Sequence, residues 1–278
     1  MTTPATGSDA FLRATFGLEG RTALVTGASS GLGRGFALTL ARAGARVAIH
    51  GRDLTRLRET REAIEVAGGA CVELTADLRE PEACRHLVAE AHAALGRLDV
   101  LVNNAGMNRR RPIEEATVDD FDAIVATNLR SAFVLGQAVH PIMRDQGGGA
   151  IVNVGSITDR YGLGSVAVYG MTKAALAQLT RTMAVEWARD GIRVNGLSPG
   201  FIVTPLTESS VWAVPQRRDW LLARIPAGRP GQPDDLAATL LLLASPASPY
   251  LTGEVIHIDG GFLAGGGWDA GRPEGEHG

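Results

Sequence analysis

Short apolar runs alternate with longer segments of helical periodicity along this chain from Arg21 onward. Runs rich in β-branched residues predict strands, and the segments between them, with apolar residues three and four apart, predict helices. The predicted strands cover residues 22–26, 45–50, 70–75, 98–102, 150–155, 192–198 and 254–258. Because such alternation is typical of βαβ units, the pattern predicts an α/β fold built on a parallel sheet.

No linker-like composition interrupts this alternation, so the 278 residues predict one domain, which we place at residues 16–264. Residues 1–15 and the glycine-rich residues 265–278 are expected to be loosely held tails. The segment Thr204–Gly228 differs from the rest, because it combines two Trp, three Pro and mixed charge without clean periodicity. This composition favours a small lid over a substrate site, and a plain surface excursion is the alternative.

Composition and charge exclude several classes of protein. The chain is 45% hydrophobic and 21% charged, as in globular proteins, and its formal net charge of −3 offers no basis for binding nucleic acid or an anionic membrane. Residues 1–20 lack a signal-peptide pattern, and no apolar run reaches the about 18 residues of a membrane span, so a cytoplasmic location is expected. Cys71 and Cys84 form no disulfide framework or metal-binding spacing, so no metal is expected.

A glycine-rich run, residues 26–33, lies between the first predicted strand and a helical pattern. Glycines at such a turn let the backbone approach a ligand closely, and a pyrophosphate can rest on the N-terminus of the following helix. The spacing departs from Gly-x-Gly-x-x-Gly, yet the strand–turn–helix setting favours dinucleotide binding. The predicted contacts are Gly27, Ser29, Ser30, Gly31, Leu32 and Gly33.

The end of the second predicted strand indicates which dinucleotide binds. A site for NAD commonly places an acidic residue there, about 20 residues past the glycines, to bind the ribose 2′-hydroxyl. Here Gly51 takes the expected acidic position and Arg52 follows it. Because a guanidinium suits a 2′-phosphate, NADP(H) is the predicted cofactor, with NAD(H) as the second possibility. The alternative is that Arg52 faces solvent, and Asp53 is expected to cap the next helix in either case.

The only lysine of the chain stands four residues after a tyrosine. Of the 27 Lys and Arg positions, Lys173 alone is Lys, and its i+4 spacing from Tyr169 brings both side chains to one face of a helix. An adjacent ammonium stabilises a phenolate, so Lys173 is predicted to lower the pKa of Tyr169 toward the range of an acid/base catalyst. An ordinary pair on a helix surface is the alternative.

In their order and spacing, these motifs resemble the short-chain dehydrogenase/reductase family over nearly all of residues 21–262. Besides the glycine-rich run and the Tyr169/Lys173 pair, the matching positions are Asp77, Leu78, Asn103, Asn104, Ala105, Gly106, Asn128, Ser156, Pro199, Gly200 and Thr204. The resemblance implies a single-domain Rossmann fold, with a doubly wound, mostly parallel seven-stranded sheet and helices on both faces. It also implies an NAD(P)-dependent enzyme that interconverts a secondary alcohol and a ketone.

The resemblance implies a role for each matching catalytic residue. Tyr169 would exchange a proton with the substrate oxygen, and Ser156 would hydrogen-bond that oxygen. Lys173 would lower the Tyr169 pKa and hold the nicotinamide ribose, and Asn128 would anchor a water that links Lys173 to solvent. The implied cofactor contacts outside the glycine-rich run are Arg52, Asp77, Leu78, Asn104, Ala105, Gly106, Tyr169, Lys173, Pro199, Gly200, Ile202 and Thr204.

Three consecutive arginines, Arg109 to Arg111, follow the Asn-Asn-Ala-Gly motif. The loop after that strand belongs to the carboxyl edge of the sheet, where ligands bind in such folds. Arg109 or Arg110 is predicted to bind a substrate carboxylate beside Ser156 and Tyr169, and a solvated, salt-bridged loop is the alternative. The run resembles the sugar-acid branch of the family, the gluconate 5-dehydrogenases and deoxygluconate dehydrogenases. A reductase of 3-oxoacyl-carrier-protein or of ketones in general stays open.

Two further expectations concern turnover and assembly. A cofactor-binding regulator without turnover is disfavoured, because Ser156, Tyr169 and Lys173 are all present. The resemblance implies a homo-oligomer, either a tetramer or a dimer. His50 and His257 stand in strand-like runs, and both are interpreted as structural.

Overall fold

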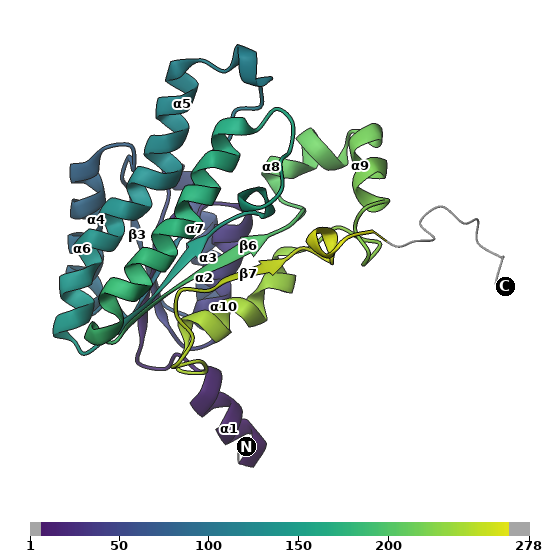
Figure 1. The fold of residues 1–278 in the computed structure, drawn as a ribbon. Coiled ribbons are helices and arrows are strands. Elements are labelled where there is room, and N and C mark those ends of the chain that lie inside the picture. The colour runs from purple at the N-terminus through teal and green to yellow at the C-terminus, as the bar shows by residue number, and fades with distance from the viewer. Residues whose placement is uncertain (1–6, 267–278) are drawn as a thin grey trace.

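Seven strands form one parallel sheet (Figure 1). The computed structural model describes residues 7–266. The strands are β1 (Thr22–Val25), β2 (Arg46–His50), β3 (Cys71–Leu74), β4 (Val100–Asn103), β5 (Gly149–Val154), β6 (Ile192–Pro199) and β7 (Val255–Ile258). Their order is β3-β2-β1-β4-β5-β6-β7, and every neighbouring pair is parallel. The predicted doubly wound sheet is confirmed, and each strand begins and ends within two residues of its predicted bounds.

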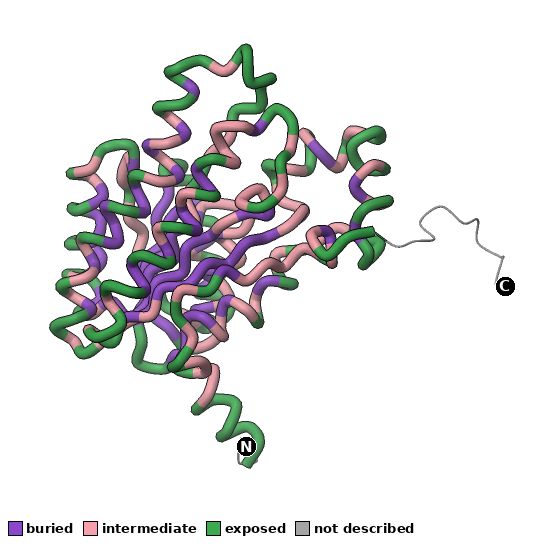
Figure 2. The backbone as a smooth tube through the Cα atoms, in the orientation of Figure 1, coloured by how far each residue is buried: buried purple, intermediate pink, exposed green. Residues whose placement is uncertain are grey.

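Helices cover both faces of the sheet. One face carries α4 (Pro81–Leu95), α6 (Ser131–Asp145) and α7 (Ala167–Trp187), and the other carries α2 (Gly31–Arg42), α3 (Leu54–Val66) and α10 (Ala237–Ala244). In β1, Leu24 joins the apolar cluster under α4 and α6, whereas Ala23 and Val25 join the cluster under α2. Because the strands are buried on both sides, as Figure 2 shows, their sequences are continuous apolar runs.

The order of the strands leaves a crevice at the carboxyl edge of the sheet. The chain moves outward from β1 to β3 and then returns to place β4 on the other side of β1. The connections after β1 and β4 therefore diverge to opposite faces, and ligands of open α/β sheets bind at such a switch point. The glycine-rich run follows β1 and the Asn-Asn-Ala-Gly motif ends β4, so both motifs meet at this crevice.

The segment Thr204–Gly228 folds into α8 (Pro205–Thr207), a π-helical turn (Glu208–Trp212) and α9 (Pro215–Leu222). In Figure 1, α8 and α9 stand beside the main body, past the carboxyl end of β6. The segment has an apolar cluster of its own, which includes Trp212, Trp220 and Leu221 and packs against Phe262. Its role as a lid stays a prediction.

The sequence reasoning missed a helix in the expected N-terminal tail. Residues 7–16 form α1 (Gly7–Phe16), which projects from the body in Figure 1 and buries none of its residues. Phe11 and Leu12 are exposed on it. The expected tail residues 1–6 and 267–278 lie outside the described part of the chain. Within residues 7–266, no helix is long and apolar enough to cross a membrane.

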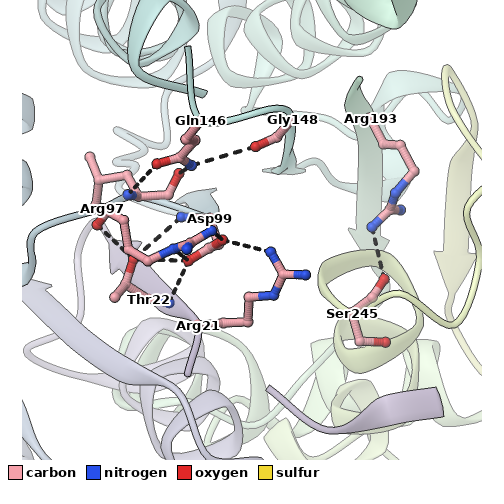
Figure 3. Close-up of polar contacts among 9 residues, drawn as sticks. Arg21, Thr22, Arg97, Asp99, Gln146, Gly148, Arg193 and Ser245 are labelled. Carbon is pink, nitrogen blue, oxygen red and sulfur yellow. Dashed lines mark hydrogen bonds and ion pairs between the residues drawn. The ribbon is translucent and has the colours of Figure 1, made fainter. Parts of the chain in front are cut away.

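A buried carboxylate organises the opposite, amino edge of the sheet (Figure 3). Asp99 precedes β4, is 4% exposed, and accepts hydrogen bonds from Arg21 Nη1 (2.8 Å), Arg97 Nε (2.7 Å) and the Thr22 backbone amide (2.9 Å). Burial alone would raise the pKa of Asp99, but these donors outweigh burial and hold the pKa below its usual value. The carboxylate thus joins β1 to β4 far from the crevice.

Candidate active site

A cavity of about 770 Å³ occupies the crevice at the carboxyl edge. Its size is in the range of small-molecule sites. The predicted site residues that line it are Gly27, Ser29, Ser30, Gly31, Leu32, Gly33, Arg52, Asp77, Leu78, Asn104, Ala105, Gly106, Arg110, Ser156, Tyr169, Lys173, Pro199, Gly200, Ile202 and Thr204. Two predicted residues, Asn128 and Arg109, are not among the lining residues. The structure therefore brings nearly all of the predicted set to one cavity.

The glycine-rich turn has the shape that a pyrophosphate requires. Gly27 and Gly31 have φ angles of +67° and +53°, and a Cβ on Gly33 would lie 2.1 Å from the Gly27 carbonyl oxygen. Side chains are thus excluded where the backbone must come close to a ligand. Helix α2 begins at Gly31, and its N-cap, Ser30, makes no side-chain capping bond. The first amide groups of α2 remain available to a phosphate, so these residues fit the dinucleotide.

His50 supports this turn from the end of β2. The Gly27 amide donates to His50 Nδ1 (3.4 Å), and His50 Nε2 donates to the Ala76 carbonyl oxygen (3.1 Å). Burial lowers the pKa of His50, so the neutral ring with its proton on Nε2 satisfies both contacts. The residue lines the cavity and joins the glycine-rich turn to the segment after β3. Its role is structural, but within the site.

Five charged residues line the cavity near the carboxyl ends of β2 and β3. They are Arg52, Asp53, Arg56, Asp77 and Arg79. A hydrogen bond from Arg79 lowers the pKa of Asp77 to about 2, and their closest N–O distance is 2.5 Å. Asp53, predicted to be a helix cap, accepts from the Arg56 amide (3.1 Å) at the start of α3. Sequence reasoning missed Arg56 and Arg79, because exposed arginines carry no motif.

Tyr169, Ser156 and Lys173 line the cavity next to one another. Tyr169 and Lys173 lie in the first turns of α7, and Ser156 follows β5 as the N-cap of a short 3₁₀ turn (Ile157–Asp159). The Ser156 hydroxyl is hydrogen-bonded to the Tyr169 phenol, and Lys173 Nζ lies 5.6 Å from the centre of the tyrosine ring. Lys173 is 4% exposed and donates to the Val154 carbonyl oxygen (2.7 Å). The predicted pairing of Tyr169 and Lys173 on one helix face therefore matches the structure.

The electrostatics of the pair differ from the sequence prediction. Burial raises the pKa of Tyr169, and the opposing influences are the Ser156 hydrogen bond and the positive charge of Arg110. Lys173 is not one of the groups that lower it, so that prediction is wrong for this structure. Burial lowers the pKa of Lys173 itself to about 8. At neutral pH both groups are therefore protonated, and Tyr169 is in its proton-donating form.

Asn128 holds the backbone of the loop after β4, residues 104–112, instead of lining the cavity. It lies in a π-helical turn (Ala126–Arg130) between α5 (Val118–Val125) and α6. Its Oδ1 accepts from the Met107 amide (2.8 Å), and its Nδ2 donates to the Met107 carbonyl oxygen (2.9 Å) and to Thr172 Oγ1 (3.3 Å). The carboxamide is thus occupied by protein, and the predicted link to a water stays a prediction.

The three arginines of this loop differ in what their side chains contact. Arg109 Nη1 and Arg111 Nε pair with the two carboxylate oxygens of Asp120, at 2.7 and 2.9 Å. Arg110 lies between them, lines the cavity, and is near enough to Tyr169 to lower the pKa of the phenol. Arg109 was one of two candidates for binding a carboxylate. The structure places it away from the cavity because the buried Asp120 carboxylate holds it, which leaves Arg110.

Some residues in and around the cavity were not predicted from the sequence as site residues. Asn108 and Thr158 line the cavity beside the catalytic group. His257 Nε2 donates to Asp159 Oδ1 (2.9 Å), which fastens the 3₁₀ turn after Ser156 to β7. His257 is therefore structural, as interpreted from the sequence. Within residues 7–266, no group of three or more His, Cys, Asp or Glu side chains is placed to hold a metal ion.

Known proteins share this sequence and fold. Residues 27–263 match the family described as enoyl-(acyl carrier protein) reductase. Gluconate 5-dehydrogenase of Gluconobacter oxydans 621H is 40% identical over 89% of this chain and 96% of that protein. 2-Dehydro-3-deoxy-D-gluconate 5-dehydrogenase of Escherichia coli K12 is 41% identical, over 90% and 98%.

A solved structure agrees with these relatives. The gluconate 5-dehydrogenase of Burkholderia cenocepacia J2315, in complex with NADP and tartrate, superposes with a TM-score of 0.87 at 36% identity, over 91% of this chain and 98% of that one. The sequence match over most of the chain, the seven-stranded sheet and the grouping of Ser156, Tyr169 and Lys173 lead to one conclusion. The chain belongs to the short-chain dehydrogenase/reductase family of oxidoreductases.

Proposed function

We propose that this protein is an NADP-dependent oxidoreductase that interconverts a secondary alcohol and a ketone on a sugar acid, such as gluconate and its keto form. The observation that carries the proposal is the position of Arg110, whose guanidinium lines the same cavity as Ser156 and Tyr169. A carboxylate bound by Arg110 would place the rest of a short polyol at the catalytic group. The names of the relatives at about 40% identity support the same substrate class.

The residues of the chain supply orientation and proton transfer. The bound nicotinamide supplies hydride chemistry, for which the protein provides position and electrostatics. In reduction, the Tyr169 hydroxyl donates its proton to the carbonyl oxygen, and Ser156 donates a hydrogen bond to the same oxygen. In oxidation, Tyr169 must first lose its proton, so the raised pKa of the buried phenol makes oxidation faster as the pH rises. Lys173, whose side chain lines the cavity beside the Tyr169 ring, would hold the nicotinamide ribose.

Arg52 supports the choice of NADP(H) over NAD(H). It follows β2 and lines the cavity, where an arginine suits the 2′-phosphate. Arg52→Ala is expected to raise the Kd for NADPH by about 10- to 150-fold, the value of a charge-assisted hydrogen bond, and to leave NADH binding nearly unchanged. Isothermal titration with both cofactors measures this. Equal weakening of the two would remove Arg52 from cofactor selection.

Arg110 provides the test of the substrate class. Arg110→Ala is expected to raise KM for a carboxylate substrate by about 10-fold or more and to leave the rate with an uncharged ketone nearly unchanged. Arg181→Ala, an exposed arginine on α7, is the matched control. If Arg110→Ala slows charged and neutral substrates alike, the carboxylate assignment is wrong. The substrate would then be a 3-oxoacyl thioester or a simple ketone.

We further propose a homotetrameric enzyme of the cytoplasm, with a catalytic domain at residues 16–264. Exposed apolar side chains on neighbouring helices support association between copies of the chain. Phe133 on α6 is 43% exposed, and Met171 and Val185 on α7 are 56% and 81% exposed. Apolar groups of this kind favour burial in an interface. Light scattering during size exclusion would determine the number of subunits.

A further inference from the structure

We propose that Asp120 is a positioning residue for substrate binding, because its pairing with Arg109 and Arg111 holds Arg110 in the cavity. Through Arg110, the buried carboxylate raises the affinity of the enzyme for carboxylate substrates over uncharged polyols. The inference rests on the proposed function and deepens it, since it names the group that directs the carboxylate-binding side chain.

The start of α5 fixes the position of the Asp120 carboxylate. Asp120 lies in the first turn of this helix and is 5% exposed, and the hydroxyl of the N-cap, Thr117, accepts from its backbone amide (3.1 Å). The Arg109 contact (2.7 Å) is a hydrogen bond, whereas the Arg111 contact (2.9 Å) is an ion pair without hydrogen-bond geometry. The bond from Arg109 is the main cause that holds the pKa of Asp120 below its usual value, so the carboxylate is ionised at neutral pH.

Asp120 separates the side chains of three consecutive arginines. Arg109 and Arg111 point to its carboxylate and do not line the cavity, whereas Arg110, between them, does line it. Where a chain is extended, neighbouring side chains point to opposite sides. Two arginines that pair with one buried carboxylate therefore turn the middle arginine toward the cavity.

Backbone contacts hold the loop on both sides of Arg110. The Arg111 amide donates to the Ser165 carbonyl oxygen (3.0 Å), and Ser165 stands four residues before Tyr169, just ahead of α7. Asn128 bonds the part of the loop that precedes Arg110. The loop is thus tied to the segment that carries the catalytic tyrosine. A carboxylate bound by Arg110 would therefore keep a defined position relative to the reacting group.

Arg110 differs from its two neighbours in its charge pairing. Within residues 7–266, both neighbouring arginines pair with Asp120, whereas Arg110 has no hydrogen bond or ion pair. Burial and the positive charge of Arg217, on α9, lower the pKa of Arg110. A substrate carboxylate would supply the missing counter-charge. If Asp120 lost its charge, the three adjacent guanidiniums would repel one another, and binding would have to order the Arg110 side chain again.

D-Gluconate and D-glucitol separate this effect from a general loss of structure, since they have the same length and differ in the carboxylate. Their Kd values for the NADPH complex of the full-length enzyme are measured by calorimetry at about pH 7.5, where the carboxylate is ionised. The KM and kcat values for oxidation are measured in parallel. The variants are Asp120→Asn, Arg110→Ala and the two together. Asp122→Asn, at an exposed carboxylate of the same helix, is the matched control.

Asp120→Asn is expected to raise the Kd and KM for D-gluconate by about three- to tenfold, the cost of ordering one long side chain on binding. The kcat should stay within a factor of two, and D-glucitol binding should not change. In the Arg110→Ala background, Asp120→Asn should have no further effect on D-gluconate, because it acts through Arg110. Asp122→Asn should behave as wild type.

A second variant tests the same contacts from the surface. Arg109→Gln combined with Arg111→Gln removes both charges from Asp120 and changes only exposed residues, so it remains informative if Asp120→Asn does not fold. It should weaken D-gluconate by at least as much as Asp120→Asn and leave D-glucitol unchanged.

Equal weakening of both polyols, additive losses in the Arg110→Ala background, or a wild type without preference for D-gluconate would overturn the inference. Binding does not require turnover, so failure of the proposed reaction is a separate result. If D-gluconate is oxidised but Asp120→Asn binds it as wild type does, the reaction stands and the positioning role is wrong. If Asp120→Asn weakens D-gluconate through Arg110 but no sugar acid is oxidised, the positioning role stands and the proposed reaction is wrong.

Discussion

Two buried charged groups, Asp99 at the amino edge of the sheet and Lys173 at the carboxyl edge, differ in how completely they are paired. At the amino edge, Asp99 is surrounded by donors from Arg21, Arg97 and Thr22, as Figure 3 shows. At the carboxyl edge, the buried ammonium of Lys173 donates to one acceptor among residues 7–266, the Val154 carbonyl oxygen.

The pKa shifts of these buried groups differ in the same way. Donors overcome burial at Asp99 and hold its pKa low, so the charged form is stable. Burial dominates at Lys173 and Tyr169, lowers the first pKa to about 8 and raises the second, and so disfavours the charged form of each. A charge with several hydrogen-bond donors stabilises the fold, whereas buried groups in a cavity whose charged forms are disfavoured can exchange protons. Substitutions at the two edges should therefore have opposite effects on activity and stability.

The largest effect is expected for Tyr169→Phe. The substitution keeps the ring and removes the proton that reduction requires, so turnover should fall by about 10²–10⁴-fold while NADPH binding and thermal stability stay close to wild type. Steady-state rates and cofactor titration measure this. Tyr250→Phe, at a fully exposed tyrosine, is the control. Activity within a factor of three of wild type would remove Tyr169 from the mechanism.

Lys173→Met is expected to abolish most turnover and to stabilise the fold at neutral pH. The folded-state pKa of about 8 lies below the unfolded value, so the buried charge costs stability below about pH 8. That cost disappears as the pH rises from about 8 to about 10.4, because the native state releases its proton first. The shift corresponds to about 3 kcal/mol, reduced by about 1 kcal/mol for the lost bond to Val154.

Urea unfolding of wild type and Lys173→Met across this pH range checks the prediction. Wild-type stability should rise relative to the variant between about pH 8 and 10. A variant that is less stable than wild type at pH 7, with the same pH dependence, would show that Lys173 is part of a stabilising cluster like that of Asp99.

Asp99→Asn should show the reverse pattern. The amide cannot pair with Arg21 and Arg97, so the free energy of unfolding should fall by about 1–3 kcal/mol, and kcat should stay within a factor of two. Because the native pKa of Asp99 is depressed, its contribution is complete above about pH 3.9 and is lost as the pH falls through the native pKa. Denaturation at pH 7 and pH 3 measures both effects. A large loss of activity without loss of stability would contradict the division between the edges.

Sequence was sufficient for the fold because the strands of a doubly covered sheet carry a strong local signal. Seven apolar runs and the glycine-rich turn placed every strand and the ligand edge. The positions of Ser156, Tyr169 and Lys173 also followed from sequence, since fixed spacing on regular elements carries them to one cavity. Helix α1 was missed, because it is short and buries no residue against the sheet.

Details that depend on contacts between distant residues did not follow from sequence. The choice between Arg109 and Arg110 depends on Asp120, which is buried on another element and captures Arg109. The direction of the Tyr169 pKa shift depends on burial, which outweighs the Ser156 hydrogen bond and the charge of Arg110. The spacing of Tyr169 and Lys173 predicts that their side chains lie close together, but it does not predict how deeply the two groups are buried.

The most direct test of the proposed function compares D-gluconate with D-glucitol, a polyol of the same length without the carboxylate, as substrates for reduction of NADP⁺. Initial rates are recorded with wild type and with Arg110→Ala, and NADPH oxidation by a 3-oxoacyl thioester is measured in parallel. Wild type is predicted to oxidise D-gluconate with a kcat/KM at least about 10-fold above that for D-glucitol, and Arg110→Ala should remove the difference. Faster turnover of the acyl thioester, or equal rates with the two polyols, would contradict the account.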